Sequence, residues 1–225
     1  MGDMTYASRA VDVLAPAQQN IPWMTWNLFL AAIPVYMAAR LFRRDDSVHA
    51  RSIKWWLGAG VFLFFLPNAL YVLTDLVHVA QDVPASSNHW QVAFIIVPQY
   101  LIFCAIGFMS YVVSLIWLGR MLSLHTRSRF VVTFVELSMH LVCSVGVYLG
   151  RFVRFNSWDI VARPYSVAQT IGETVGSRVP IVVIGIFFVS TTVLYGIAKH
   201  VTIAVVTYIR TGGPGRARTL TQKYL

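Results

Sequence analysis

Five long apolar runs dominate the chain, and they restrict its fold more than any other feature. Each run holds about 20 residues, the length that a helix needs to cross the hydrocarbon core of a bilayer. Backbone groups in lipid must form their hydrogen bonds within the segment, as an α-helix does. The runs therefore predict an all-α, polytopic membrane bundle with five transmembrane helices, at residues 23–41, 55–73, 92–118, 130–149 and 179–198.

The composition agrees with a membrane protein. Charged residues make up 12% of the chain, whereas they make up about a quarter of a soluble domain. The two cysteines, Cys104 and Cys143, fall inside apolar runs, so we expect small buried hydrophobic side chains rather than a disulfide or a metal site. Residues 1–22 lack the basic start and apolar core of a cleaved signal peptide. The sequence contains no nucleotide-binding or zinc-protease motif.

Basic residues are distributed unevenly between the two sides of this bundle. Thirteen Lys and Arg residues fall on the side of the first connection, the third connection and the C-terminal tail, and five fall on the other side. Because cytoplasmic loops carry the excess of basic residues, we expect the N-terminus outside and the C-terminus inside. The same asymmetry explains the net charge of +9, so we expect no nucleic-acid partner.

This orientation divides the chain into three parts. They are an extracytoplasmic segment (1–22), a transmembrane domain (23–209) and a basic cytoplasmic tail (210–225). A sixth apolar segment at residues 201–209 is too short to cross a bilayer. We interpret it as a continuation of the last helix along the inner surface, in the manner of a short interfacial helix.

Four polar residues recur along the outer end of the second predicted span. Asn68, Tyr71, Asp75 and His78 follow one another at steps of three, four and three. On a helix these steps place all four side chains in one stripe, provided that the chain stays helical past Pro67. A proline inside a helix removes a backbone hydrogen bond, and Asn68 is well placed to bind a carbonyl group freed there.

The fourth predicted span also runs outward and ends in polar residues. The two polar groups reach the same side of the membrane, so we predict one composite site. Its members are Asn68, Tyr71, Asp75, His78, Arg151, Arg154, Asn156 and Asp159. We expect Asn27 and Gln99, from the first and third spans, to line its floor. Gly146 and Gly150 would allow the fourth helix to approach a neighbour closely.

Glu136 and His140 lie deeper in the fourth span. They are four residues apart and therefore share a helix face. Ionisable groups in a span are costly and usually face the interior of the bundle. We expect an intramembrane pair, with Glu136 either protonated or bound to His140.

Two stretches of the sequence resemble a known family. Phe-Leu-Pro-Asn-Ala-x-Tyr-x-x-Thr-Asp-Leu-x-His at 65–78 and Gly-Arg-Phe-x-Arg-x-Asn-Ser-Trp-Asp at 150–159 are similar to motifs of the bacterial membrane family catalogued as domain of unknown function 1361. The resemblance covers most of the chain, although Leu70 stands where many members have proline. It implies a bacterial cytoplasmic membrane protein and brings no activity, substrate or cofactor.

Several chemical roles remain open for the polar residues. Asp75 and His78 suit a catalytic acid/base pair, or a divalent metal site with Asp159 as third ligand. Alternatively, Asp75 pairs with Arg151, and His78 stabilises a helix C-terminus. Asn156 with Asp159 also fits a helix N-cap.

Arg151 and Arg154 suit either a specific anion site or contact with lipid headgroups. The sequence thus favours an outward-facing pocket that binds a lipid or another anionic amphiphile. In this interpretation Arg151 and Arg154 hold the head, and Asn68, Tyr71 and Asp75 orient it. One alternative is a membrane-embedded hydrolase or transferase, with or without a metal, that acts on a lipid-linked substrate. Another is a transporter, and a third is an accessory subunit whose polar residues only lock helices together. The sequence identifies no protein partner.

Reporter fusions test the orientation. We expect alkaline phosphatase inserted within residues 74–91 to be active, because its disulfides form only outside the cytoplasm. The same reporter within residues 119–129 should be inactive. The reverse pattern would place the N-terminus inside.

Overall fold

The computed structural model describes residues 2–43, 52–85, 89–155, 159–176 and 178–211. Within these ranges the chain forms helices and no strand, so the predicted all-α class is confirmed. In chain order the helices are α1 (Gly2–Leu41), α2 (Ile53–Tyr71), η1 (Val72–His78), α3 (Val79–Ala85), α4 (His89–Gln91), η2 (Val92–Ile96), α5 (Val97–Thr126), α6 (Arg129–Arg151), α7 (Asp159–Ala162), α8 (Pro164–Gly176) and α9 (Arg178–Thr211). η1 is a 3-10 helix and η2 is a stretch of π-helix.

Five helical stretches are long and apolar enough to cross a membrane, which confirms the predicted number. They are Ala17–Leu41, Ile53–Pro84, His89–Thr126, Arg129–Arg151 and Arg178–Thr211. By length and composition, the chain is therefore a multi-pass membrane protein. All five stretches are longer than the predicted spans, and the second, third and fifth exceed them most, because their helices continue past the apolar runs.

The second stretch stays helical past Pro67, as the predicted polar stripe requires. Pro67 lies inside α2, and the helix narrows to the 3-10 form at Val72 before returning to the α form at Val79. In a 3-10 helix, side chains three residues apart lie one above the other. Asp75 and His78 are therefore aligned on one face of η1.

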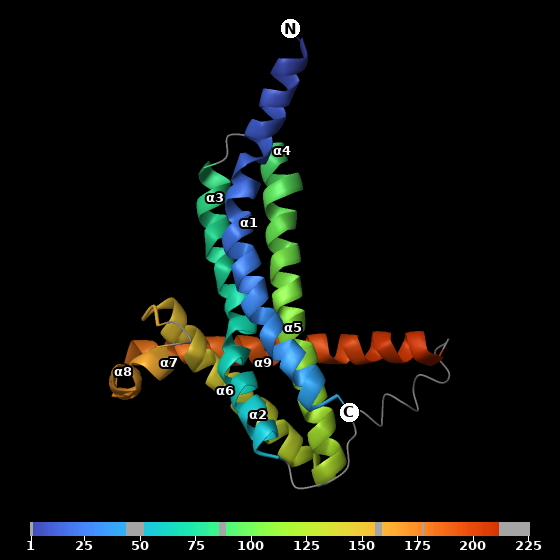
Figure 1. The fold of residues 1–225 in the computed structure, drawn as a ribbon, viewed down its shortest axis with the longest axis vertical. Helices are drawn as coiled ribbons and strands as arrows, with labels where there is room; N and C mark the ends of the chain where they lie inside the picture. Colours follow the sequence, from blue (N-terminus) through green and yellow to red (C-terminus); the bar gives the residue numbers. More distant parts are fainter. Residues whose placement is uncertain (1, 44–51, 86–88, 156–158, 177, 212–225) are drawn as a thin grey trace.

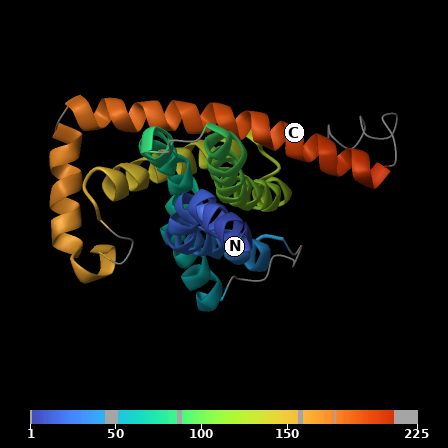
Figure 2. The ribbon, with the colours of Figure 1, turned by 90° about the horizontal axis from the view of Figure 1, so that it is seen from above.

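The helices do not all run in one direction. α1, the α2–η1–α3 stretch and α5 run side by side and form the upright part of the molecule (Figure 1). α9 crosses this part instead of running along it and packs against α6 and α5, as Figure 2 shows from above. Residues 201–209 continue α9 without a break, which confirms that they form no separate helix.

Glycines allow two of the closest helix contacts. A Cβ atom added to Gly146 of α6 would lie 2.8 Å from the Pro67 side chain, and one added to Gly107 of α5 would lie 2.7 Å from the Val72 side chain. Neither position therefore admits a larger residue without movement of a neighbour. The close approach predicted for the fourth span is confirmed, and its partner is the proline-containing part of α2.

Substitution of Gly146 tests the importance of this contact. We expect Gly146→Ala to lower the free energy of unfolding by about 1–3 kcal/mol, since overpacking of a tight interface carries a cost of that size. Thermal unfolding in detergent measures the effect. Gly196→Ala on α9 is the matched control, because an added Cβ there meets nothing within 4 Å. Equal melting temperatures for the two variants would contradict the prediction.

Candidate functional site

Asp75 is the centre of a polar network between α1, η1 and α6. Its side chain is only 2% exposed. Asn27 donates a hydrogen bond of 2.8 Å to Oδ2, and Arg151 approaches Oδ1 at 3.3 Å. Arg151 also donates to the Tyr71 hydroxyl at 3.5 Å, and its guanidinium lies 5.9 Å from the centre of the Tyr71 ring. We call Asn27, Tyr71, Asp75, His78 and Arg151 the outer network.

His78 lies at the rim of this network. Its Nε2 atom is 4.0 Å from Asp75 Oδ1, and its side chain is 38% exposed. Its ring packs against Trp23 with 5.2 Å between the ring centres, while Nδ1 lies 3.3 Å from Gln81 Oε1. His78 is therefore the member of the network that is most accessible from outside the protein.

A second carboxylate, Asp82, extends the polar contacts toward the N-terminal half of α1. Asn20 donates to Asp82 Oδ2 at 2.7 Å, and the Tyr100 hydroxyl donates to the same atom at 2.9 Å. Trp23 in turn donates to Asn20 Oδ1 at 3.0 Å. The sequence analysis missed Asp82, although its position seven residues after Asp75, two helical turns later, placed it on the same face.

The structure brings together four of the eight residues of the predicted composite site and places others elsewhere. Tyr71, Asp75, His78 and Arg151 come together, and the alternative in which Asp75 pairs with Arg151 is confirmed. Asn68 instead donates to the Phe65 carbonyl at 3.2 Å within its own helix.

The residues that follow α6 were predicted to complete the site. Arg154 is exposed with a positive φ of 64°, and Asp159 is buried at the start of α7. The contacts described for Asp75 come instead from Asn27, Arg151 and His78. Asn156 lies outside the described residues.

One alternative left open by the sequence was a metal site formed by Asp75, His78 and Asp159. Asp75, His78 and Asp159 are all described, and no group of three or more His, Cys, Asp and Glu side chains in the described ranges is placed to hold an ion. The physical reason is that Asp159 begins a separate helix after the end of α6, whereas Asp75 is enclosed between α1 and α6. Of the two floor residues, Asn27 binds Asp75, but Gln99 binds the Ala17 carbonyl at 2.9 Å.

Glu136 belongs to a second network, between α6 and α9. Lys199 binds both of its oxygens, at 2.7 and 2.9 Å, and the Tyr195 hydroxyl donates to Oε1 at 2.7 Å. His140 is bound by a different group, the Tyr111 hydroxyl, 2.6 Å from Nδ1. We call these five residues the inner network.

The expectation that Glu136 binds His140 directly is therefore wrong, because each side chain binds a different partner. The two side chains are linked through Tyr195, whose ring lies 4.7 Å from the His140 ring. Lys199 directly follows the last predicted span, at 179–198, and the sequence analysis gave it no partner. The spacing of four residues between Tyr195 and Lys199, which places both on one face of α9, was the available signal.

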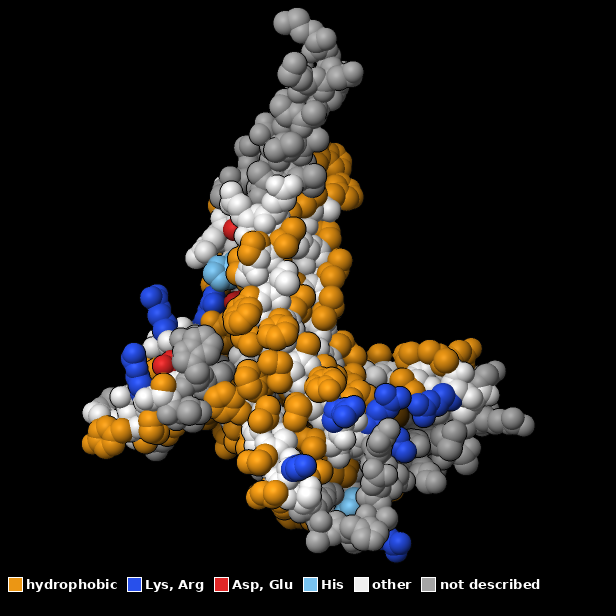
Figure 3. Space-filling model, in the orientation of Figure 1, with side chains coloured by type: hydrophobic (Ala, Val, Ile, Leu, Met, Phe, Trp, Pro, Cys, Tyr) orange, Lys and Arg blue, Asp and Glu red, His pale blue; other side chains and the backbone are white. Residues whose placement is uncertain are grey.

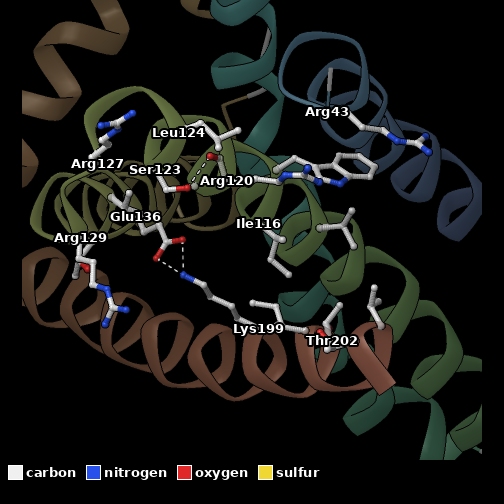
Figure 4. Close-up of a pocket in the computed structure, with 18 of the residues that line it drawn as sticks. Arg43, Ile116, Arg120, Ser123, Leu124, Arg127, Arg129, Glu136, Lys199 and Thr202 are labelled. Carbon is white, nitrogen blue, oxygen red and sulfur yellow. Dashed lines mark hydrogen bonds and ion pairs between the residues drawn. The ribbon is translucent and has the colours of Figure 1, made fainter. Parts of the chain in front are cut away.

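A cavity of about 720 Å³ lies beside the inner network, between α5, α6 and α9. The walls include apolar side chains such as Val113, Ile116, Val132, Ile203 and Val206. The described lining also includes six cationic side chains and one carboxylate: Arg43, Arg120, Arg127, Arg129, Lys199, Arg210 and Glu136. Figure 4 shows Lys199 reaching from α9 to the Glu136 carboxylate, and both residues line this space. We call this space the basic cavity.

The basic cavity is built from residues that are far apart in the sequence. Arg43 follows α1, Arg120 is on α5, Arg129 begins α6, and Arg210 is near the end of α9. All of them belong to the segments whose positive charge predicted the cytoplasmic side. The tertiary structure thus gathers these charges around one space.

Comparison with known proteins gives one match. The model of a family described as "Protein of unknown function (DUF1361)" matches residues 26–193. The matched part includes the outer network and Glu136, and it ends before Tyr195 and Lys199. No curated protein and no solved structure matches the chain.

Loss of the central carboxylate tests the outer network. We expect Asp75→Asn to destabilise the protein by about 2 kcal/mol, since Arg151 and Asn27 would lose a charged acceptor. The Asp75→Asn/Arg151→Gln double variant should lose less than the sum of the single variants, because the two residues interact. Unfolding in detergent measures both effects, with Arg154→Gln as an exposed control that leaves stability unchanged. Additive losses would show that the ion pair contributes nothing.

Proposed function

The chain belongs to the family described as Protein of unknown function (DUF1361), and from that premise we propose that it binds a lipid or another amphiphile with an anionic head. The observation that carries the proposal is the basic cavity, in which apolar walls and six cationic side chains face one space. Its volume of about 720 Å³ falls in the range of about 300–1,000 Å³ that is usual for small-molecule sites.

Each half of such a ligand has a matching surface. Apolar side chains of α5, α6 and α9 would contact a hydrocarbon chain, and arginines would bind the head. Arginine suits this role because its planar guanidinium donates two parallel hydrogen bonds to a phosphate or a carboxylate. Arg43 lies 6.0 Å from the centre of the Trp117 ring, a cation–π contact that holds it at the cavity wall.

The proposal includes an orientation and a location. The distribution of basic residues, thirteen against five, supports an N-terminus outside and a C-terminus inside. The family resemblance supports the cytoplasmic membrane of a bacterium. With this orientation the basic cavity lies at the cytoplasmic end of the bundle, and the ligand is a molecule that reaches the inner leaflet.

This assignment moves the ligand site from the outer to the inner end. The outer network then acts as a structural lock, because Asp75 is buried and both of its oxygens accept hydrogen bonds from neighbouring helices. The alternative is an enzyme in which Asp75 and His78 act on a lipid-linked substrate at the outer side. The enclosure of Asp75 by Asn27 and Arg151 favours the structural role.

Native mass spectrometry of the purified protein tests the proposed function. We expect the wild type to retain an anionic amphiphile, and we expect Arg120→Gln/Arg129→Gln to lose at least about 90% of it, since each arginine contributes charged hydrogen bonds to the head. Arg163→Gln/Arg178→Gln removes the same charge from exposed positions outside the cavity and should retain the amphiphile.

Asp75→Asn separates the two ends of the molecule. It should keep the amphiphile if the ligand occupies the basic cavity. Loss in Asp75→Asn, with retention in Arg120→Gln/Arg129→Gln, would move the site to the outer network. Equal retention in every variant would contradict both locations.

A further inference from the structure

Lys199 is a cation of the basic cavity that contacts within the protein hold in place. Both oxygens of Glu136 accept hydrogen bonds from its amino group, at 2.7 and 2.9 Å, and the amino group lies 5.6 Å from the centre of the Tyr195 ring. The side chain is 19% exposed and lines the cavity. A donor that is already fixed loses little freedom when a ligand binds, so Lys199 is well suited to contact an anionic head.

The amino group of Lys199 keeps a donor for such a ligand. A lysine ammonium group carries three N–H donors, and its contacts with Glu136 use at most two of them. Two acceptors on one tetrahedral nitrogen, each at ordinary hydrogen-bond distance, lie about 4–5 Å apart. An anion bound to Lys199 would therefore lie close to the Glu136 carboxylate, within the range of about 4–6 Å in which a like charge favours the protonated form of a carboxyl group.

Glu136 is the acidic group that an anion in the cavity would meet. Among the described residues that line the space, it is the one carboxylate. Figure 3 shows Lys and Arg side chains gathered where the lower end of the bundle meets the C-terminal half of α9, and the acidic side chains visible on that face lie elsewhere. Because Glu136 lines the cavity, water that enters the cavity can deliver a proton to it.

The groups around Glu136 can accommodate both of its protonation states. The Tyr195 hydroxyl of α9 donates to Oε1 at 2.7 Å, and a hydroxyl also accepts, so this contact can persist when the carboxyl group becomes the donor. His140 of α6 and Tyr111 of α5 lie next to the Tyr195 ring, with 4.7 and 6.2 Å between ring centres, and bind each other. Neither protonation state therefore leaves the buried carboxyl group without a partner.

The charged groups that line the cavity with Glu136 decide when the proton is taken up. They are Lys199, Arg43, Arg120, Arg127, Arg129 and Arg210. These cations favour the ionised form of Glu136 while the cavity holds no anion, because an opposite charge nearby stabilises a carboxylate. An anion beside Lys199 opposes that effect. The proton is therefore bound together with the ligand and not before it.

Resting on the proposed function, we infer that the anionic head binds through Lys199 and that Glu136 takes up a proton from water when it does. The proton returns to water when the ligand leaves. Binding of the amphiphile is thus coupled to pH through one carboxyl group, and the cavity holds its ligand more tightly as the pH falls.

Calorimetric titration of the detergent-purified protein with dihexanoylphosphatidylglycerol tests the inference. The phosphodiester of this probe keeps a single negative charge near neutral pH, so a proton taken up is bound by the protein. Titrations in two buffers with different enthalpies of ionisation give the number of protons. We expect wild-type protein to take up close to one proton, and its affinity to fall by up to about tenfold for each unit by which the pH rises through the range in which Glu136 titrates.

Three variants assign the proton and the contact. Glu136→Gln should bind the probe at least as tightly as the wild type, without proton uptake and with an affinity that does not depend on pH. Lys199→Met should weaken the probe by about tenfold or more, because a charged hydrogen bond is lost. Asp82→Asn is the matched control, since it removes another carboxylate that accepts from a tyrosine hydroxyl, and it should keep the proton uptake.

Infrared difference spectra of the wild type give a readout that needs no variant. Addition of the probe should produce the band of a protonated carboxyl group. Probe binding without proton uptake and without this band would overturn the inference and leave the proposed function in place. Unchanged uptake in Glu136→Gln would overturn the assignment to Glu136. Absence of binding, in wild-type protein with a cooperative unfolding transition, would overturn the function and the inference together.

Discussion

A polar side chain inside a bilayer has no water to bind, so it requires a partner within the protein. Asp75 and Glu136 meet this requirement in similar ways. Each carboxylate is bound by one cation and one neutral donor, and the donors come from other helices. Asp75 thereby joins α1, η1 and α6, while Glu136 joins α6 and α9. α6 takes part in both networks and so connects the upright part of the molecule to the crossing helix α9.

Close packing of the helices brings the donors of these contacts within hydrogen-bonding distance of the two carboxylates. Gly146 allows α6 to pack directly on Pro67. A Cβ atom added to Gly150 would lie only 3.3 Å from the Tyr71 ring, so α6 also lies close to α2 at that position. That approach places Arg151 beside Asp75. In the same way, Gly119 leaves room on α5 for the Glu136 carboxylate. Small residues in membrane helices commonly permit such approach, and here Gly119 and Gly150 each lie next to a residue of an ion pair.

Basic residues have two roles in this molecule. As a group, they supply the asymmetry from which an orientation is predicted. Individually, six of them line a cavity that also has apolar walls. The two roles are compatible because the connections on one side of a bundle converge at one end. Lys199 differs from the others, since its charge is used within the protein to neutralise Glu136.

The sequence by itself determined the helical class, the number of spans and the polar stripe along the second span, because these features depend on local properties: apolar length and helical spacing. It also predicted that Gly146 lies at a helix contact, and it offered the pairing of Asp75 with Arg151 as one of several alternatives. Only the tertiary structure decided which partners Glu136 and His140 take, since Lys199, Tyr195 and Tyr111 lie on other helices and spacing along one helix cannot identify them. It also showed that the basic connections surround a cavity. That outcome depends on how α9 crosses α5 and α6, a property of packing between distant segments that no local pattern records.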